Sequence, residues 1–292
     1  KGSEGRYPAD LLIKWKMQHE QRIEILTSIA PERKSNVVLY GANIGAEKSP
    51  INYHGCVEAM FPNWYPATEK PVTLSMVSEL KDHSEQYWQA ESQHLTKRFQ
   101  SKISSIIEED SCKHFSLFAL APQPLLIKLG ALLTDKIEVE TYQLHREPKG
   151  WFWQDCTDDF EYIINRPQNM DGKPALVLSL SDNVSHERIT RVIGPDTSIW
   201  EVTIKQPHND FIQSKQQLSL FRKCIRKLII EIKNTHGDVT PLQIFPVMPV
   251  SCAVELGRAR MPKADMPWLI YDHDIKTQQF VLAIELRGDL HE

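Results

Sequence analysis

Four short segments of this chain carry residues that could hold a small ligand. Each one follows a predicted strand, at residues 41–45, 121–124, 179–183 and 247–251. In open α/β sheets, ligands bind beyond the carboxyl ends of the strands, where the strand order switches. We therefore expect these segments to line one binding site. The residues expected to contact the ligand there are Ala42, Asn43, Ile44, Pro122, Gln123, Pro124, Ser181, Asp182, Met248, Pro249 and Ser251.

Phosphate is the ligand chemistry that two of these segments favour. Residues 121–124 and 247–251 both lead into predicted helices, and the free N–H groups and dipole of a helix start attract anions. Prolines in both segments could also start helices without binding anything. We favour binding because both copies share the pattern. The spacing Gly41-x-x-x-Gly45 adds little, because it matches neither a dinucleotide fingerprint nor a P-loop.

Aromatic stacking would be a second ingredient of nucleotide recognition. Trp151 and Trp153 follow a predicted strand, close in sequence to the cations Arg146 and Lys149. One indole could stack on a purine while Arg146 contacts a phosphate. Both tryptophans could instead pack over the end of the sheet, and the sequence leaves the two interpretations open.

Two further groups of polar residues give weaker signals. Asn209 or Asp210 could cap the helix predicted over 211–234 or read a base edge, and we favour capping. Three cations lie at or just after the end of another predicted helix, where positive charge complements the helix dipole. We expect these cations to contact a neighbouring subunit; they are Arg258, Arg260 and Lys263.

Signatures of catalysis and of metal binding are absent from the sequence. No Gly-x-Ser-x-Gly, no His-Glu-x-x-His and no cysteine–histidine arrangement stands out. The acidic residues between Asp155 and Glu161 are most simply a solvated loop, and residues 272–274 (Asp-His-Asp) fall at a predicted surface turn. We predict no catalytic residue, no metal site and no cofactor in this chain.

Composition limits the possible partners. The chain has 292 residues, a formal net charge of −4 and 41% hydrophobic residues, which is ordinary for a soluble globular protein. It therefore lacks the overall positive field that grips a nucleic-acid backbone. Its five scattered cysteines indicate reduced thiols in a cytoplasm. No long apolar run or signal-peptide pattern occurs, so no membrane association is expected.

An internal repeat predicts the architecture. Residues 117–130 and 244–257 each read as an apolar strand followed by a proline-started helix. Strands alternating with helices imply parallel pairing through right-handed crossovers. We predict an α/β fold of two fused Rossmann-like halves, each a mainly parallel sheet flanked by helices. The repeat aligns Phe118 with Phe245, Pro122 with Pro249, Leu129 with Leu256 and Gly130 with Gly257.

Hydrophobic periodicity predicts the individual elements. The strands expected in the first half are 37–40, 72–77, 114–121 and 138–145, and its helices are 84–109 and 123–134. The strands expected in the second half are 175–180, 198–204, 242–245, 268–272 and 279–286, and its helices are 184–193, 211–234 and 250–260. A separate helix is expected at 7–26, before a linker at 31–36.

Several segments, in order, resemble the SAVED domain, the ligand-sensing module of CBASS antiphage effectors. They are His114-Phe-Ser-Leu-Phe-Ala-Leu-Ala-Pro-Gln-Pro, His145-Arg-Glu-Pro-Lys-Gly-Trp-Phe-Trp, Gln206-Pro-His-Asn-Asp, residues 245–258 and residues 261–272. The resemblance implies a sensor domain over 36–292, made of two CARF-like halves at about 36–165 and 174–292. It also implies binding of a cyclic di- or oligonucleotide, such as a cGAMP or a cyclic trinucleotide, made by a partner cyclase. Ligand binding would drive homo-oligomerisation and so activate an attached effector.

The N-terminal helix suggests which effector that is. Residues 7–22 resemble the last helix of HNH endonucleases, whose metal-binding histidine and other motifs would lie upstream. We therefore expect residues 1–35 to be the end of a nuclease domain plus a linker, and the lysine at position 1 to mark a fragment. Double-stranded DNA and a divalent metal would then be bound only by the missing domain, in a bacterial cytoplasm.

A non-catalytic sensor is thus the favoured function, with three rivals. A ring nuclease would cleave its cyclic ligand, but it needs an acid–base pair that the sequence does not display. A SAVED sensor serving a different effector remains open. A NAD-dependent dehydrogenase would need the glycine fingerprint that is missing here.

Overall fold

The fold is known from a computed structural model, which describes residues 13–14, 16–17, 20, 31–42, 51–75, 84–109, 113–154, 160–274, 276–288 and 290. The predicted ligand residues Asn43 and Ile44 lie outside this part of the chain, as do most of the predicted helix 7–26 and the acidic segment 155–159. The described residues of that helix are helical and exposed.

The first sheet is parallel in every described pair. It contains β1 (Lys34–Gly41), β2 (Tyr65–Pro66), β3 (Val72–Thr73), β4 (His114–Leu120) and β5 (Glu138–Thr141). The strand order is β2-β1-β4-β5, and β3 also pairs with β1. The predicted strand 138–145 ends earlier, at Thr141, and its last residue starts a small hairpin of β6 (His145–Arg146) and β7 (Lys149–Gly150).

The second sheet repeats this order and adds antiparallel strands at both edges. It contains β8 (Ile163–Asn165), β9 (Lys173–Ser179), β10 (Thr197–Thr203), β11 (Leu242–Val247), β12 (Trp268–Asp274) and β13 (Gln279–Leu286). The order is β13-β12-β11-β9-β10-β8, with β8 and β13 antiparallel to their neighbours. Its central order β12-β11-β9-β10 matches β5-β4-β1-β3 of the first sheet. The predicted α/β fold of two mainly parallel halves is therefore confirmed, although β8, placed by sequence at the end of the first half, pairs within the second sheet.

The helices are α2 (Tyr53–Met60), α3 (Glu85–Phe99), α4 (Ser105–Glu109), α5 (Gln123–Leu133), α6 (His186–Ile193), α7 (Lys215–His236) and α8 (Val250–Ala259). The predicted helix 84–109 is interrupted by a π-helical turn at Gln100–Ser104. The predicted capping of α7 by Asn209 or Asp210 is wrong. Ser214 caps α7, accepting from the Gln217 N–H at 3.2 Å while the Gln217 side chain accepts from the Ser214 N–H.

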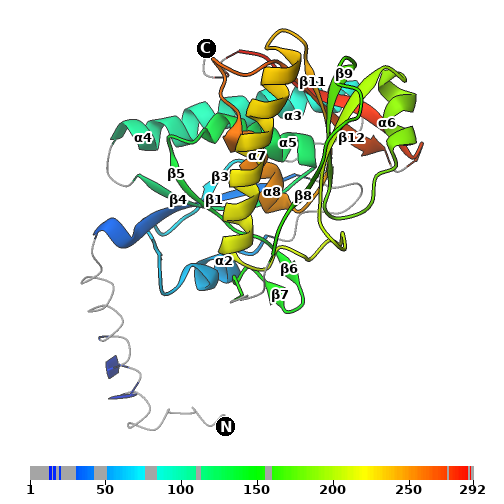
Figure 1. The fold of residues 1–292 in the computed structure, drawn as a ribbon. Helices are drawn as coiled ribbons and strands as arrows, with labels where there is room; N and C mark the ends of the chain where they lie inside the picture. Colours follow the sequence, from blue (N-terminus) through cyan, green and yellow to red (C-terminus); the bar gives the residue numbers. More distant parts are fainter. Residues whose placement is uncertain are drawn as a thin grey trace.

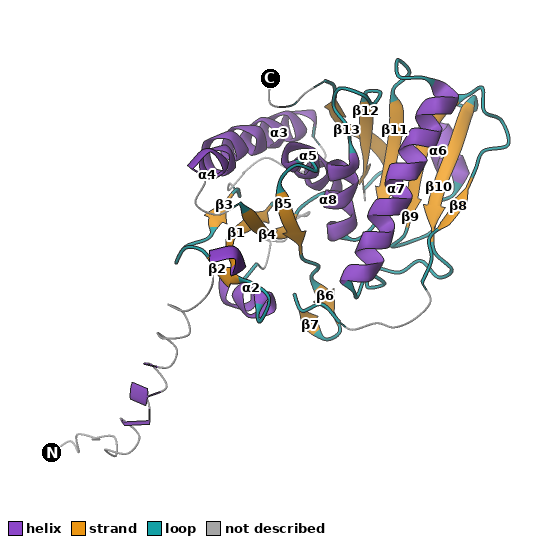
Figure 2. Cartoon of the chain, turned by 60° about the vertical axis from the view of Figure 1, so that its left-hand side comes forward, coloured by secondary structure: helices purple, strands orange, loops and turns teal. Residues whose placement is uncertain are grey.

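Alternating residues on the strands divide the apolar side chains between two faces of each sheet. In β9, Ala175 and Val177 join a cluster with Ile189 of α6, whereas Leu176 and Leu178 face the large central core. The first sheet likewise has α2 on its outer face. Helices α3, α5, α7 and α8 share the central core between the sheets, and the ribbon views show α5 and α8 lying there (Figure 1 and Figure 2).

The repeated phrase forms the contact between the two halves. Helices α5 and α8 cross with their backbones touching. A methyl group on Gly130 would overlap the Val254 carbonyl oxygen and lie 2.9 Å from the Arg258 nitrogen. One on Gly257 would overlap the Ile127 carbonyl oxygen. Glycine is therefore required at both aligned positions, because only it lets the helices approach this closely.

The preceding strands repeat the same packing on their outer faces. Phe118 of β4 stacks on Tyr142 with ring centroids 4.3 Å apart, and Phe245 of β11 stacks on Tyr271 at 4.5 Å. A second aromatic ring packs edge-on against each phenylalanine at 5.2 Å, from Trp151 and Phe280 respectively. The sequence repeat thus corresponds to a repeat in three-dimensional packing.

We predict that Gly130→Ala lowers the free energy of unfolding by about 2–3 kcal/mol, because the added methyl group must push two backbones apart. Gly55→Ala in α2 is the matched control: nothing lies within 4 Å of its added methyl group, and alanine favours a helix over glycine by up to about 1 kcal/mol. Urea denaturation measures both. Equal stability of the two variants would contradict the close crossing.

Candidate ligand-binding site

A pocket of about 390 Å³ opens where the carboxyl ends of strands from both halves meet. We call it the hairpin pocket, because the β6–β7 hairpin forms one wall. Leu120 ends β4, Ser181 follows β9, and Met248 follows β11. Its lining residues are Leu120, Gln143, Leu144, His145, Arg146, Lys149, Ser181, Asn209, Asp210, Met248, Pro249 and Val250.

Hydrogen bonds bring three of the four predicted segments together at this pocket. The Leu180 and Ser181 N–H groups both donate to the Val247 carbonyl, at 2.9 and 2.8 Å. The Met248 N–H donates to Oε1 of Gln123 at 3.3 Å, which joins the starts of α5 and α8. Segments 121–124, 179–183 and 247–251 are therefore neighbours, as the position rule for α/β sheets predicts.

Four of the predicted contact residues line the pocket itself: Arg146, Ser181, Met248 and Pro249. Four others lie elsewhere. Ala42 is buried after β1, Pro122 and Pro124 are buried at the start of α5, and Asp182 is exposed and accepts from the N–H of Asn183. These four would need a change of conformation, or a ligand that extends beyond the pocket, to make contact.

The start of α8 is already hydrogen-bonded within the chain. Both the N–H and the hydroxyl of Ser251 donate to Oε1 of Gln143, at 3.2 and 2.8 Å. Ser251 is completely buried beneath the pocket. A phosphate could reach these donors only by displacing Gln143, so contact between Ser251 and a ligand stays a prediction. No motif pointed to Gln143, because an isolated glutamine after a strand carries no recognisable pattern.

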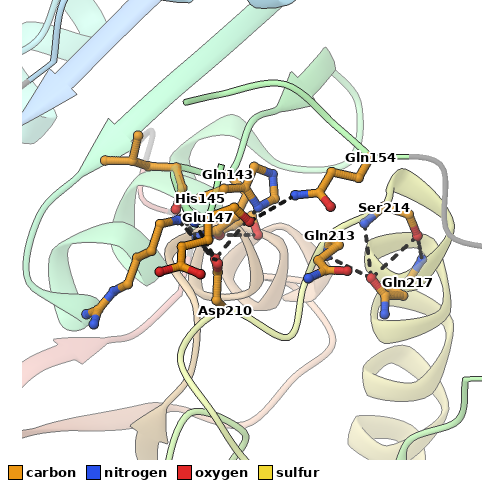
Figure 3. Close-up of polar contacts among 11 residues, drawn as sticks. Gln143, His145, Glu147, Gln154, Asp210, Gln213, Ser214 and Gln217 are labelled. Atoms are coloured by element: carbon orange, nitrogen blue, oxygen red, sulfur yellow. Dashed lines mark hydrogen bonds and ion pairs between the residues drawn. The ribbon is translucent and has the colours of Figure 1, made fainter. Parts of the chain in front are cut away.

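The hairpin is fastened to the second half by Asp210. Its carboxylate accepts from the Arg146 N–H with both oxygens at 3.3 Å, and from the Glu147 N–H at 3.3 Å (Figure 3). This is the role of Asp210 in place of the predicted helix cap. The exposed Arg146 and Lys149 are thereby held at the mouth of the pocket, where they supply positive charge.

His145 lies at the base of the hairpin and also lines the pocket. Its side chain is only 1% exposed, and neither ring nitrogen has a hydrogen-bond partner among the described residues. Nδ1 lies 3.8 Å from Oδ1 of Asp210, which is too far for a hydrogen bond. Burial lowers the pKa of the imidazole, and the negative charge of Asp210 opposes that shift only in part.

The two tryptophans have different surroundings, and neither lines the hairpin pocket. Trp151 packs in the outer core of the first half, edge-on to Phe118. Trp153 is half-buried and lines a separate groove of about 510 Å³ between β5 and α7. Its ring lies edge-on to His145 with centroids 5.8 Å apart, so it separates the groove from the pocket. The geometry supports the interpretation of Trp151 as a core residue. Stacking of Trp153 on a ligand base stays a prediction, and it would take place in the groove.

A ladder of polar contacts joins α8 to β5 and runs away from the pocket. Ser251, Glu255 and Arg258 lie on one face of α8 because they are spaced four and three residues apart. Ser251 bonds Gln143 and Glu255 accepts from Thr141 Oγ1 at 2.9 Å. The Arg258 guanidinium donates to carbonyl oxygens at the free edge of β5 and in the turn before it. These are the oxygens of Thr134, Ile137 and Val139, at 3.0, 2.9 and 3.1 Å.

Glu255 is the centre of this ladder and is fully buried. It accepts from Arg222 of α7 at 2.7 Å and from Arg258 at 3.2 Å, so two cations balance its charge. Burial lowers the pKa of Arg258, and the carboxylate of Glu255 partly restores it.

The two arginines that we expected at an oligomer interface point inward. Arg258 belongs to the ladder, and Arg260 donates to the carbonyl oxygens of Leu286 and Gly288 at 3.4 and 3.0 Å. Both are buried within one chain, whereas Lys263 is exposed. Of the three residues, only Lys263 presents its side chain to a possible neighbour without rearrangement.

In the described part of the chain, no group of three histidine, cysteine, aspartate or glutamate side chains is placed to hold a metal ion. Among the same residues, no helix is both long and apolar enough to span a membrane.

Comparison with known proteins supplies the family. The sequence profile of the SAVED domain, described as "SMODS-associated and fused to various effectors sensor domain", matches residues 95–286. This match spans more than half of the chain. The chain belongs to the SAVED family. Among curated proteins, no match was found.

Solved SAVED structures have the same fold. A Cap4 SAVED/CARF-domain containing receptor from Acinetobacter baumannii, solved with the cyclic trinucleotide 2′3′3′-cAAA, is 11% identical, with a TM-score of 0.55 over 87% of this chain. The same receptor with 3′3′3′-cAAA is 12% identical, with a TM-score of 0.55 over 86% of this chain. The Cap4 receptor of Moraxella osloensis is 12% identical, with a TM-score of 0.52 over 87%. This SAVED chain spans 50–51% of the length of those receptors.

We predict that Glu255→Ala lowers the free energy of unfolding by about 3–5 kcal/mol, because it leaves Arg258 buried without its counter-charge. Arg166→Ala is the control: it removes an ion pair with Glu231 between partly exposed side chains and should change stability little. Denaturant titration compares the two. A loss for Glu255→Ala no larger than that of the control would refute the central role of the ladder.

Proposed function

We propose that this SAVED domain is a sensor that binds a cyclic oligonucleotide in the hairpin pocket. One observation carries the proposal: loops from the carboxyl ends of strands in both halves enclose a single pocket, with Arg146 and Lys149 at its mouth. A cyclic oligonucleotide carries one negative charge on each phosphodiester, so cations at the rim complement it. Ser181 and Asn209 supply neutral polar groups that could read sugar or base edges.

The solved relatives support this ligand class. Two of the similar Cap4 receptor structures contain cyclic trinucleotides. The family name describes a sensor domain rather than an enzyme. Cyclic trinucleotides are therefore the first ligands to test on this chain, followed by cyclic dinucleotides.

We further propose how binding is put to use. Ligand-bound copies would associate through exposed surfaces that include Lys263, and association would activate an effector attached before β1. An HNH-type DNA endonuclease is the proposed effector, based on the resemblance of residues 7–22 to the last helix of such nucleases. A ligand can drive association only if it binds the associated state more tightly than the free state.

We predict that Arg146→Glu and Lys149→Glu each weaken cyclic trinucleotide binding by about tenfold or more, because each replaces a charge-assisted contact with repulsion. Lys223→Glu, on the exposed face of α7, is the matched control and should leave affinity unchanged. Isothermal titration calorimetry with a panel of cyclic di- and trinucleotides measures the effect. Absence of binding by every member of the panel would overturn the sensor proposal.

Mass spectrometry after long incubation of the protein with its ligand tests for cleavage. A sensor should return the cyclic ligand intact, and a linearised product would indicate a ring nuclease instead.

We predict that ligand raises the mass of the protein in solution, and that Lys263→Glu reduces this increase without altering ligand affinity. The reason is that Lys263 is exposed and lies outside the hairpin pocket. Multi-angle light scattering with and without a bound cyclic nucleotide tests the assembly, with Lys223→Glu again as control. An unchanged mass at saturating ligand would count against assembly while leaving the binding proposal intact.

A further inference from the structure

Among the described residues, neither ring nitrogen of one buried histidine in the hairpin pocket has a hydrogen-bond partner. His145 is only 1% exposed, and both Nδ1 and Nε2 are shielded from solvent in the described structure. A buried polar group without a partner destabilises the folded protein, because it has lost its hydrogen bonds to water. Such a cost at the wall of a pocket indicates that the free protein is incomplete there, and that a polar ligand group would remove the cost.

Asp210 is placed to serve as the second partner of the ring. It accepts three main-chain contacts from Arg146 and Glu147, whereas an ionised carboxylate has about four acceptor positions. Among the described residues, these contacts leave one acceptor position of the carboxylate, and Nδ1 of His145 lies 3.8 Å from its Oδ1. A shift of about 1 Å would convert this approach into a hydrogen bond.

The charges around His145 favour an anionic ligand at its other nitrogen. Asp210 contributes negative charge from the segment before α7, and the hairpin contributes Arg146, Glu147 and Lys149. The pocket residues from β4, β9, β11 and the start of α8 carry no charge. In the free protein, burial keeps the imidazole pKa below its ordinary value, so the ring is neutral near pH 7.

We propose that His145 is a ligand-binding residue of this pocket that takes up a proton from solvent when a phosphate group binds. Because Nε2 is shielded in the free protein, the ring must first shift toward the pocket. The imidazolium then donates Nδ1–H to Asp210 and Nε2–H to a phosphate oxygen. Its charge is neutralised from both sides, and both ring nitrogens are satisfied. This inference rests on the proposed function, because it concerns the same pocket, but it adds a linkage between ligand binding and pH.

The direction of the pH dependence follows from proton uptake. A bound phosphate favours the charged ring, so the imidazole pKa is higher in the complex than in the free protein. Affinity therefore rises as pH falls between these two pKa values, by up to about tenfold per pH unit. Below the pKa of the free protein the affinity levels off, since the ring is then charged in both states. Phosphodiesters keep their single negative charge throughout this range, so the ligand does not contribute.

Two measurements on the intact chain test the proposal. Calorimetry with 3′3′3′-cAAA from about pH 5.5 to about pH 8, a range of about 2.5 pH units, gives the slope of affinity against pH. The NMR titration of the His145 ring gives its pKa in the free protein, with 3′3′3′-cAAA and, separately, with inorganic pyrophosphate. His145→Gln keeps a polar side chain of similar size and should remove the slope. His208→Gln is the matched control, because His208 is exposed nearby and its Nδ1 contacts the Gln206 carbonyl within its own loop; it should preserve the slope.

The outcomes separate this inference from the function on which it rests. A raised His145 pKa with either probe, and a slope lost in His145→Gln alone, support it. Tight binding of 3′3′3′-cAAA with no pH slope, or an unchanged ring pKa with both probes, overturns it. If pyrophosphate raises the ring pKa while no cyclic nucleotide binds, the phosphate contact of His145 stands and the sensor proposal falls.

Discussion

The contact between α5 and α8 is the constraint on which the rest of the structure depends. Two helices can touch backbone to backbone only where neither carries a side chain, and Gly130 and Gly257 meet that condition at aligned positions. The close approach maximises van der Waals contact along both helices. It also fixes the two sheets relative to each other, because α5 follows β4 directly and α8 follows β11 directly. The pocket at the strand ends exists because these helix starts are held side by side.

The two halves differ around this shared crossing, and the pocket is asymmetric as a result. The α5 positions aligned with Ser251, Glu255 and Arg258 are Pro124, Lys128 and Ala131. Lys128 bonds Ser92 of α3 at 2.6 Å, and burial lowers the pKa of its amine to about 8. Only α8 carries the full polar ladder to the opposite half. Likewise, the β6–β7 wall of the pocket comes from the first half, so the two halves contribute different walls.

The fold could be predicted from the sequence because its signals are local and repeated. The strands 114–121 and 279–286, and the helices 123–134 and 250–260, were predicted to within one residue, since each joins an apolar run to a clear boundary such as Pro122 or Pro249. Errors arose where a distant contact decides the structure. β5 ends at Thr141, and the chain then enters the β6–β7 hairpin. The mixed pattern of polar and apolar residues continues through 138–145, so it did not reveal this end of the strand. Ser214 rather than Asp210 caps α7, because the carboxylate of Asp210 is engaged by the hairpin.

The sequence predicted which segments lie together better than it predicted which side chains line the pocket. The position rule selected segments 121–124, 179–183 and 247–251, which the fold brings together, but it could not tell which side chains turn toward the pocket. Trp151 is an example, because its partner Phe118 lies more than thirty positions away in the sequence. The roles of Gln143 and His145 depend on their neighbours Ser251 and Asp210, which belong to the other half. Pairings of this kind are invisible until the chain is folded.

The arginine at the end of the ladder has a consequence for how copies of this protein can meet. An edge strand normally offers a row of open carbonyl and amide groups that recruits strands from other molecules. The carbonyl of Val139 in β5 and that of Ile137 just before the strand are instead covered by the guanidinium of Arg258. A strand from another molecule could pair with these carbonyls only by displacing the buried guanidinium, so this edge disfavours uncontrolled intermolecular sheet extension.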